Sequence, residues 1–296
     1  GTGTQEVSCL ISQYGGGISH AIGVGGRDLK SEVGGISTLM AIDALDHDPS
    51  TEHIVLISKP PPAEVGTKVL DRVAVSGKPT TVCFIGASDL AMPENATQVF
   101  GLKAAAQAAL GLDNKDEVHL DVTLGSMVER HKVQGLYSGG TLCAEAQVLF
   151  RAANLAIFSN APIPGVPDTD NANTGHRLLD LGDDQYTQGR PHPMIDPSVR
   201  DDVIVAALND SNTAIILVDV VIGYGAHTDP AGHLVAVLSD HAPSDAPLVI
   251  ASVTGTDEDP QVRATQMAKL GDAGVHVAPT NADAAQWAIE LINVAS

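Results

Sequence analysis

The sequence predicts an α/β protein of two tandem domains, each with a parallel β-sheet covered by helices. Three observations predict this class. The chain has 296 residues, enough for about two domains. Short runs rich in Val and Ile alternate with helical runs, which implies parallel strands joined by crossover helices. The same order of elements then occurs a second time.

The first domain is expected to cover residues 1–125. Buried strands are expected where short apolar runs are bounded by Gly, Pro or charge, at residues 20–25, 53–58 and 80–86. Helices are expected between and after them, at residues 5–14, 36–45, 63–75 and 104–112. Residues 113–132 are charged and weakly patterned, which favours a linker.

The second domain is expected to cover residues 126–296. Strands are expected at residues 133–137, 214–221, 248–253 and 275–277. Helices are expected at residues 141–153, 197–208, 232–239, 261–271 and 282–294. Residues 178–181 lead into a loop. Residues 160–176, rich in Pro, Gly, Asn and Asp, indicate an irregular surface insertion.

An internal repeat supports the two-domain interpretation. Three pairs of segments match in the same order, namely 2–6 with 140–145, 46–57 with 209–218, and 77–82 with 245–250. If the repeats match fully, the first domain lacks its opening strand, which would lie before Gly1.

Composition excludes several classes of partner. There are 16 Lys and Arg against 36 Asp and Glu, a formal net charge of −20. Such a chain repels nucleic acid and anionic membranes, so we expect neither as a partner. Solubility alone also explains the acidity. Three scattered cysteines fit a reducing compartment, and no run reaches ~18 apolar residues, so we expect a cytoplasmic protein.

Two Gly/Thr/Ser turns at helix starts are the strongest signal of a ligand site. The first contains Thr2, Gly3 and Thr4, and the second contains Ser138, Gly139, Gly140 and Thr141. A helix N-terminus exposes unpaired N–H groups and the positive end of the helix dipole, so these turns are candidate phosphate- or carboxylate-binding sites. Ordinary helix capping is the alternative for both.

A third candidate follows a predicted strand. Gly25 and Gly26 precede Arg27, whose guanidinium can bind a carboxylate or phosphate through two N–H groups. Ligands of open parallel sheets bind beyond the carboxyl ends of strands. Structural pairing of Arg27 with Asp28 or Glu32 is the alternative.

A Pro-rich loop over residues 181–197 supplies candidate catalytic residues. Arg190 is a second candidate anion-binding side chain, and His192 is a candidate proton carrier near neutral pH. Asp183 and Asp184 are candidates to orient it. A capped connecting loop, with Asp196 capping the next helix at Pro197, is the alternative.

Other candidates are weaker, and we predict no metal site. His227, Asp229 and His233 have an H-x-D-x3-H spacing that a metal could use, but nothing else supports it. Lys59 follows a predicted strand and could bind an anion, but a solvated side chain is the simpler interpretation. Cys143 lies near a helix start that could lower the pKa of its thiol, but packing in the core is the simpler interpretation. Neither a G-x-S-x-G nucleophile turn nor a Walker A lysine motif is present.

The chain resembles a known family in these residues and motifs. Residues 1–87 resemble the second domain of the succinyl-CoA synthetase α subunit, and the chain from residue 133 is similar to the carboxy-terminal domain of its β subunit. The fused arrangement, with GGRDL, GLYSGGTLCAEA and LGDDQYTQGRPHPMIDP, looks like the FdrA family.

The resemblance implies two flavodoxin-like ligase domains whose paired helix starts hold a phosphorylated group. That role would fall on Thr2, Gly3 and Thr4, and on the turn from Ser138 to Thr141. The chain also departs from the synthetase pattern. The phosphohistidine of that family has no counterpart in residues 86–118, which contain no His, and no part of these 296 residues resembles the nucleotide-binding domain or the amino-terminal CoA-binding domain.

The leading hypothesis is therefore an FdrA-type carbamoyltransferase subunit that acts in allantoin degradation. It would move a carbamoyl group between a small acid, oxamate or oxalurate, and phosphate, with phosphate or carbamoyl phosphate as ligand. It would work with other subunits or as a homodimer. An acyl-CoA synthetase that binds CoA and uses a partner's nucleotide domain is the second hypothesis. A non-catalytic assembly subunit is the third.

Overall fold

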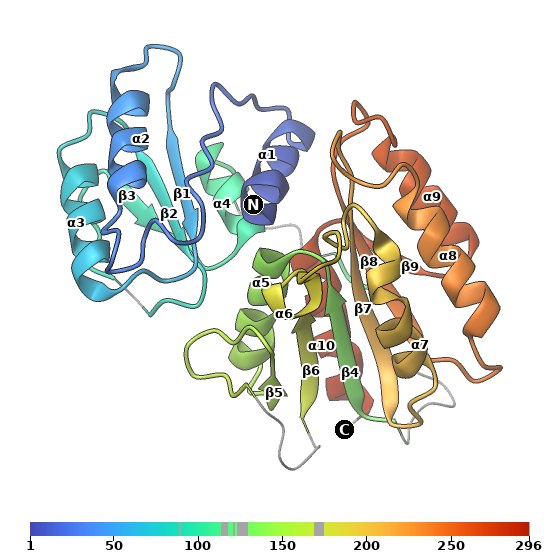
Figure 1. The fold of residues 1–296 in the computed structure, drawn as a ribbon. Helices are drawn as coiled ribbons and strands as arrows, with labels where there is room; N and C mark the ends of the chain where they lie inside the picture. The colour runs from blue at the N-terminus through green and yellow to red at the C-terminus, as the bar shows by residue number, and fades with distance from the viewer. Residues whose placement is uncertain (89, 114–117, 121, 123–129, 169–174, 296) are drawn as a thin grey trace. The chain divides into compact units, whose positions relative to one another are not determined.

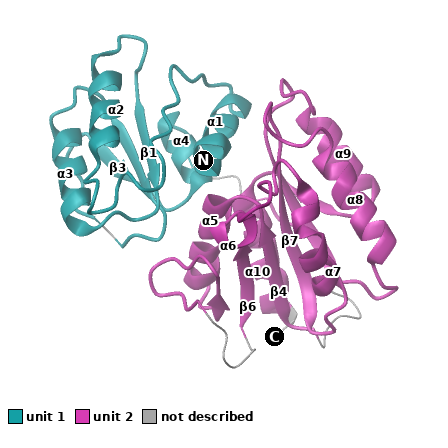
Figure 2. Cartoon of the chain, in the orientation of Figure 1, with its two compact units in different colours: residues 1–115 teal, residues 116–296 magenta. Residues whose placement is uncertain are grey.

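The structure, a computed structural model, describes residues 1–88, 90–113, 118–120, 122, 130–168 and 175–295. The chain divides into two compact units, residues 1–115 and 116–296 (Figure 2). The boundary expected between residues 125 and 126 lies outside the described residues. Both units contain parallel sheets and helices, so the α/β class is confirmed.

Unit 1 contains a small parallel sheet of order β1-β2-β3. Its strands are β1 (Ile54–Ser58), β2 (Thr80–Phe84) and β3 (Ala96–Gln98). Its helices are α1 (Thr2–Gln13), α2 (Ile36–His47), α3 (Ala63–Ala74) and α4 (Leu102–Ala109). On one face, α2 and α3 pack against β2 through a core that includes Ile42, Val69 and Phe84. Helices α1 and α4 pack together and contact β1 and β2 (Figure 1).

The strand predicted at residues 20–25 is wrong. The segment forms no ladder with any described strand, and most of its residues are exposed, including Ile22 at 45%. Its start is instead tied to the approach to β1, where Ser19 Oγ bonds Thr51 Oγ1 and His20 pairs with Asp48. A short apolar run becomes a strand only where a neighbouring strand satisfies its backbone. The short strand β3 was not predicted.

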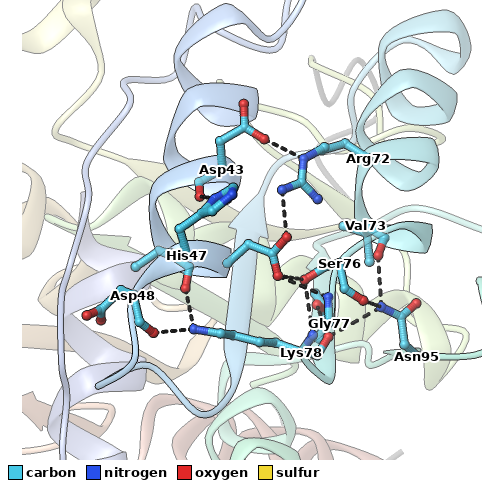
Figure 3. Close-up of polar contacts among 12 residues, drawn as sticks. Asp43, His47, Asp48, Arg72, Val73, Ser76, Gly77, Lys78 and Asn95 are labelled. Atoms are coloured by element: carbon cyan, nitrogen blue, oxygen red, sulfur yellow. Dashed lines mark hydrogen bonds and ion pairs between the residues drawn. The ribbon is translucent and has the colours of Figure 1, made fainter.

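A polar cluster fixes the amino-terminal end of this sheet (Figure 3). The Asp46 carboxylate accepts hydrogen bonds from Arg72 Nη2 at 2.8 Å, Ser76 Oγ at 2.7 Å and the Gly77 N–H at 3.0 Å. Lys78 donates its ammonium to the carbonyls of Leu45 and Asp48 at the end of α2. A cation suits this position because the last carbonyls of a helix are unpaired and carry partial negative charge.

Unit 2 contains a parallel sheet of order β5-β6-β4-β7-β8-β9. Its strands are β4 (Lys132–Tyr137), β5 (Ile157–Phe158), β6 (His176–Asp180), β7 (Thr213–Val221), β8 (Leu248–Thr254) and β9 (His276–Ala278). The central strands β4 and β7 are buried along their whole length, as expected for parallel strands covered on both faces. Strand β5 was not predicted, and residues 178–181, expected only to lead into a loop, fall largely in β6.

Helices cover both faces of this sheet (Figure 1). These are α5 (Gly140–Ala152), α7 (Asp201–Leu208), α8 (Pro230–His241), α9 (Arg263–Asp272) and α10 (Asn281–Ala295). Helices α7, α8 and α9 share one apolar core with the sheet, whereas α5 and α10 pack together on the other face. A short 3-10 helix at Pro197–Arg200 precedes α7, so the single helix expected at residues 197–208 is divided.

The expected insertion and the length of the helices can also be compared with the structure. Residues 160–168 of the expected insertion are irregular, as predicted, and residues 169–174 lie outside the description. Among the helices of the described residues, none has the length and apolar character needed to cross a bilayer.

Candidate functional site

The connections of unit 2 reverse their direction across the sheet between β4 and β7. From β4 the chain passes through α5 to β5 and β6 on one side of the sheet, and then returns to β7 on the other side. In open parallel sheets the crevice at such a reversal is where ligands bind. The turn from Ser138 to Thr141, at the start of α5, lies at this point.

The start of α5 presents two backbone N–H groups. Gly139 is the N-cap residue, and Gly140 and Thr141, both partly exposed, are the first two helical residues. No group in the described part of the chain accepts from the N–H of either residue. Because the helix dipole places partial positive charge here, these two donors suit a negatively charged or strongly polar oxygen.

The two preceding N–H groups are already occupied by a buried carboxylate. Asp219, near the carboxyl end of β7, is fully buried and accepts from the Ser138 N–H at 2.6 Å, the Gly139 N–H at 2.7 Å and Ser138 Oγ at 3.0 Å. Arg200, 3% exposed, donates Nη1 to the same carboxylate at 3.0 Å. The pair is therefore neutral as a whole, and it joins β7 to the start of α5.

His192 lies beside this turn. Its Nε2 and the Ser138 carbonyl oxygen lie 2.5 and 2.6 Å from the point that a Cβ on Gly182 would occupy. Burial lowers the pKa of His192, which favours the neutral ring. The Met194 N–H donates to Nδ1 at 3.2 Å, so the proton of the neutral ring is on Nε2. His192 can therefore donate a hydrogen bond from the atom nearest the turn.

Polar residues form one row across the sheet under the start of α5. Tyr137 on β4 is in register with Asp180 on β6, and Asp219 on β7 is in register with Ser252 on β8. Tyr137 and Asp219 are also neighbours across β4 and β7, because the residues just before them, Leu136 and Val218, are paired. Asp180 Oδ1 accepts from the Gly182 N–H at 3.0 Å, and Oδ2 lies 2.3 Å from the Cβ position of Gly140. Burial raises the pKa of Tyr137 well above its usual range, so its phenol stays neutral.

The other residues predicted in this loop do not orient His192 through any hydrogen bond of the described residues. Asp183 caps the short helix α6 (Asp184–Thr187) by accepting from the Gln185 N–H at 3.1 Å, and Asp184 is exposed. Among the hydrogen bonds of the described residues, none joins either carboxylate to His192. Arg190 is exposed, and its backbone N–H donates to the Thr187 carbonyl.

The predicted residues of unit 1 occupy two separate turns. Thr2, Gly3 and Thr4 form the first turn of α1, where the N–H groups of Thr4 and Gln5 bond the Gly1 carbonyl. Arg27 is exposed, next to Gly25 at φ +82° and the exposed Gly26. Asp28, offered as its alternative partner, instead accepts from the Ser37 and Thr38 N–H groups at the start of α2.

The three candidate metal ligands have other partners. Asp229 caps α8 and accepts from Lys269 Nζ at 2.7 Å, while His233 Nε2 pairs with Asp201 at 2.8 Å. The rings of His227 and His233 meet edge to face at 6.1 Å. No three His, Cys, Asp or Glu side chains within the described ranges are grouped to hold a metal ion.

Sequence reasoning missed Asp219, Arg200 and Asp180. A signal existed for Asp219, because it is the one charged residue in the otherwise apolar run AIILVDVV. A carboxylate in a buried strand requires partners that neutralise or hydrogen-bond it. Which partners it finds depends on the turn after β4 and on the helix before α7, both far away in sequence.

Comparisons with known proteins agree with this architecture. The sequence profile of the CoA-ligase family matches residues 136–291, from the end of β4 into α10. The Escherichia coli (strain K12) protein YahF, described as uncharacterized, is 37% identical over 311 aligned positions. The match covers 99% of this chain and 60% of YahF, so the chain spans about 60% of the length of this curated relative.

Two solved structures are more distantly similar. One is PH0766 from Pyrococcus horikoshii OT3, with a TM-score of 0.33 and coverage of 86% of this chain and 55% of that one. The other is an ATP citrate lyase mutant from Methanosaeta concilii in complex with (3S)-citryl-CoA, with a TM-score of 0.35 and coverage of 88% and 37%. Both are 11% identical to this chain. The profile match spans more than half of the sequence, and the chain therefore belongs to the CoA-ligase family.

Proposed function

We propose that the chain is a subunit of a group-transfer enzyme that moves a carbamoyl group between a small acid, oxamate or oxalurate, and phosphate. The observation that carries the proposal is the pair of N–H groups of Gly140 and Thr141, which have no partner among the described residues and lie at the reversal point of the sheet. Two such donors at a helix start suit a phosphate oxygen or a developing oxyanion.

The chemistry requires one proton transfer. When the carbamoyl group passes from oxalurate to hydrogen phosphate, the nitrogen–carbon bond breaks and a carbon–oxygen bond to phosphate forms. The proton lost by phosphate moves to the departing nitrogen, which leaves as the amide of oxamate. The Nε2–H of neutral His192, beside the turn, can donate a hydrogen bond to the carbamoyl oxygen as negative charge develops there, while the proton passes directly from phosphate to the departing nitrogen. We assign Arg190, an exposed arginine in the loop that carries His192, to the carboxylate of the small acid.

Turnover tests the proposal most simply. The full chain, with its partner subunits where these are required, is incubated with carbamoyl phosphate and oxamate, and phosphate release is followed. We expect Gly140→Ala to reduce turnover about tenfold or more, because its Cβ would lie 2.3 Å from Asp180 Oδ2 beside the donor pair. Gly271→Ala in α9 is the control, since a Cβ there meets nothing within 4 Å. Equal turnover in both variants would contradict the assignment of the site.

The family match favours a second candidate, ligation of a small acid to CoA with a nucleotide domain supplied by a partner subunit. This candidate predicts turnover that requires both CoA and a nucleoside triphosphate, and no phosphate release from carbamoyl phosphate. The third possibility, an assembly subunit, predicts that variants at Gly140 and His192 change partner association while the chemistry of the complex is unaffected.

A further inference from the structure

Four hydrogen-bond donors converge on the buried carboxylate of Asp219. They are the Ser138 and Gly139 N–H groups, the Ser138 hydroxyl, and Nη1 of Arg200. Two backbone N–H groups at a helix start, one hydroxyl and one guanidinium form the donor set that proteins use to bind a free oxyanion. Here a side chain of the same protein occupies the position that an anion would take.

The guanidinium of Arg200 provides an independent indication that anion-binding capacity remains at this position. Arg200 is 3% exposed, and its Nε has no hydrogen-bond partner within the described residues. Its Nη1 bonds the side chain and the carbonyl oxygen of Asp219. A buried guanidinium with an unused donor is costly unless a negative group stays beside it, so Asp219 is needed for charge balance as well as for hydrogen bonding.

We infer that Asp219 is a positioning residue that closes the inner half of the α5 turn to ligand anions. By occupying the Ser138 and Gly139 N–H groups and neutralising Arg200, it directs an incoming oxyanion outward to the N–H groups of Gly140 and Thr141. The inference rests on the proposed function for the outer position, but the closed inner position is a property of the fold itself. Anion specificity then depends on one carboxylate that never contacts the substrate.

This role predicts that removing the Asp219 carboxylate increases the affinity for phosphate, whereas removing a purely structural carboxylate would not. Asp219→Ala exposes two N–H groups and an unbalanced guanidinium, so inorganic phosphate should take the place of the lost carboxylate. We expect phosphate to bind the variant about tenfold or more tightly than it binds the wild type, and to raise its thermal unfolding temperature by a larger increment. Turnover should fall at the same time, because the anion is bound too deep, so that KM for phosphate and kcat decrease together.

A matched control exists in unit 1. Asp46 also accepts from an arginine, a serine hydroxyl and a glycine N–H, namely those of Arg72, Ser76 and Gly77 (Figure 3). That cluster lies at the carboxyl ends of α2 and α3, where the helix dipoles disfavour an anion, and Arg72 keeps Asp43 as a second partner. Asp46→Ala should therefore lose stability without any gain in phosphate affinity.

The experiment is a phosphate titration, by calorimetry and by thermal unfolding, of the full chain as wild type, Asp219→Ala, Asp219→Ser and Asp46→Ala. Asp219→Ser also removes the carboxylate and vacates its position, and it decides the question if the alanine variant does not fold. Tighter phosphate binding in the Asp219 variants alone supports the inference, even if the wild type shows no turnover and the proposed function fails. Equal or weaker phosphate binding in folded Asp219 variants overturns the inference and leaves the proposed function standing if the wild type is active.

Discussion

Burial holds the His176 side chain in one protonation state, and this has a consequence for stability. Burial, together with the nearby His131 and Lys132, lowers the pKa of His176 to about 4. Its Nδ1 accepts from the Val133 N–H at 3.1 Å, a bond that a protonated ring cannot accept, and its ring meets Phe150 edge to face. The folded state therefore requires the neutral imidazole.

We predict that His176 contributes acid sensitivity to unit 2. A lowered pKa in the folded state gives stability that is complete above about pH 6.5 and is lost as the pH falls toward 4. His176→Gln should remove one proton's share of this dependence, about 1.4 kcal/mol per pH unit within that window. The measurement is the free energy of unfolding in urea between pH 4 and pH 7.5. An unchanged pH slope in the variant would contradict the prediction.

Close packing explains why residue 182 is a glycine. A special backbone conformation does not, because the φ of Gly182 is not positive. A Cβ would lie 2.5 Å from His192 Nε2 and 2.6 Å from the Ser138 carbonyl oxygen, and the backbone atom cannot move without shifting the α5 turn. We predict that Gly182→Ala destabilises the protein by about 1–3 kcal/mol and displaces His192. Urea unfolding measures the first effect. Gly225→Ala, in a neighbouring loop with open space around its Cβ, should stay within about 0.5 kcal/mol of the wild type.

Among the elements, the loop between α3 and β2 depends on the Asp46 cluster. A hydrogen bond from Ser76 and the guanidinium of Arg72 lower the pKa of Asp46 to about 2. The stability it gives is thus complete above about pH 4 and is lost as the pH falls toward 2. We predict that Asp46→Ala costs about 2 kcal/mol at pH 7, measured by urea unfolding. The cost should vanish near pH 2, and a cost that persisted there would require a different explanation.

Most helices and strands could be predicted because their apolar spacing coincides with their burial. The run AIILVDVV became the fully buried strand β7, and the helix predicted at residues 63–75 became α3 with Val65, Val69 and Val73 inside. Residues 20–25 have the same composition as a buried strand but have no ladder partner among the described strands. Whether such a run pairs depends on neighbouring strands, which its own sequence does not determine.

At the scale of the whole molecule, the site could be predicted only in part. The turn at Ser138–Thr141 and the loop that carries His192 follow from local signals, a Gly-rich helix start and a Pro-fixed segment. The partnership of Asp219 with Arg200 and Ser138 joins positions 19 and 81 residues apart in the chain, so no local pattern encodes it. Long-range pairing of this kind follows from the strand order, which places β7 beside β4.

The segments of the internal repeat lead into corresponding strands in the two units. The matched segments 46–57 and 209–218 lead into β1 and β7, and the segments 77–82 and 245–250 lead into β2 and β8, which are neighbouring parallel strands in each unit. The helix starts of α1 and α5 are the other matched pair.

The most direct test of the proposed activity is isothermal titration of the full-length protein, alone and with its partner subunits, with phosphate, carbamoyl phosphate, oxamate and CoA in separate runs. Carbamoyl transfer at the α5 turn predicts that phosphate or carbamoyl phosphate binds, that oxamate binds in its presence, that Gly140→Ala abolishes the heat, and that CoA gives none. Micromolar binding of CoA together with no binding of carbamoyl phosphate would contradict carbamoyl transfer and support acyl-CoA ligation.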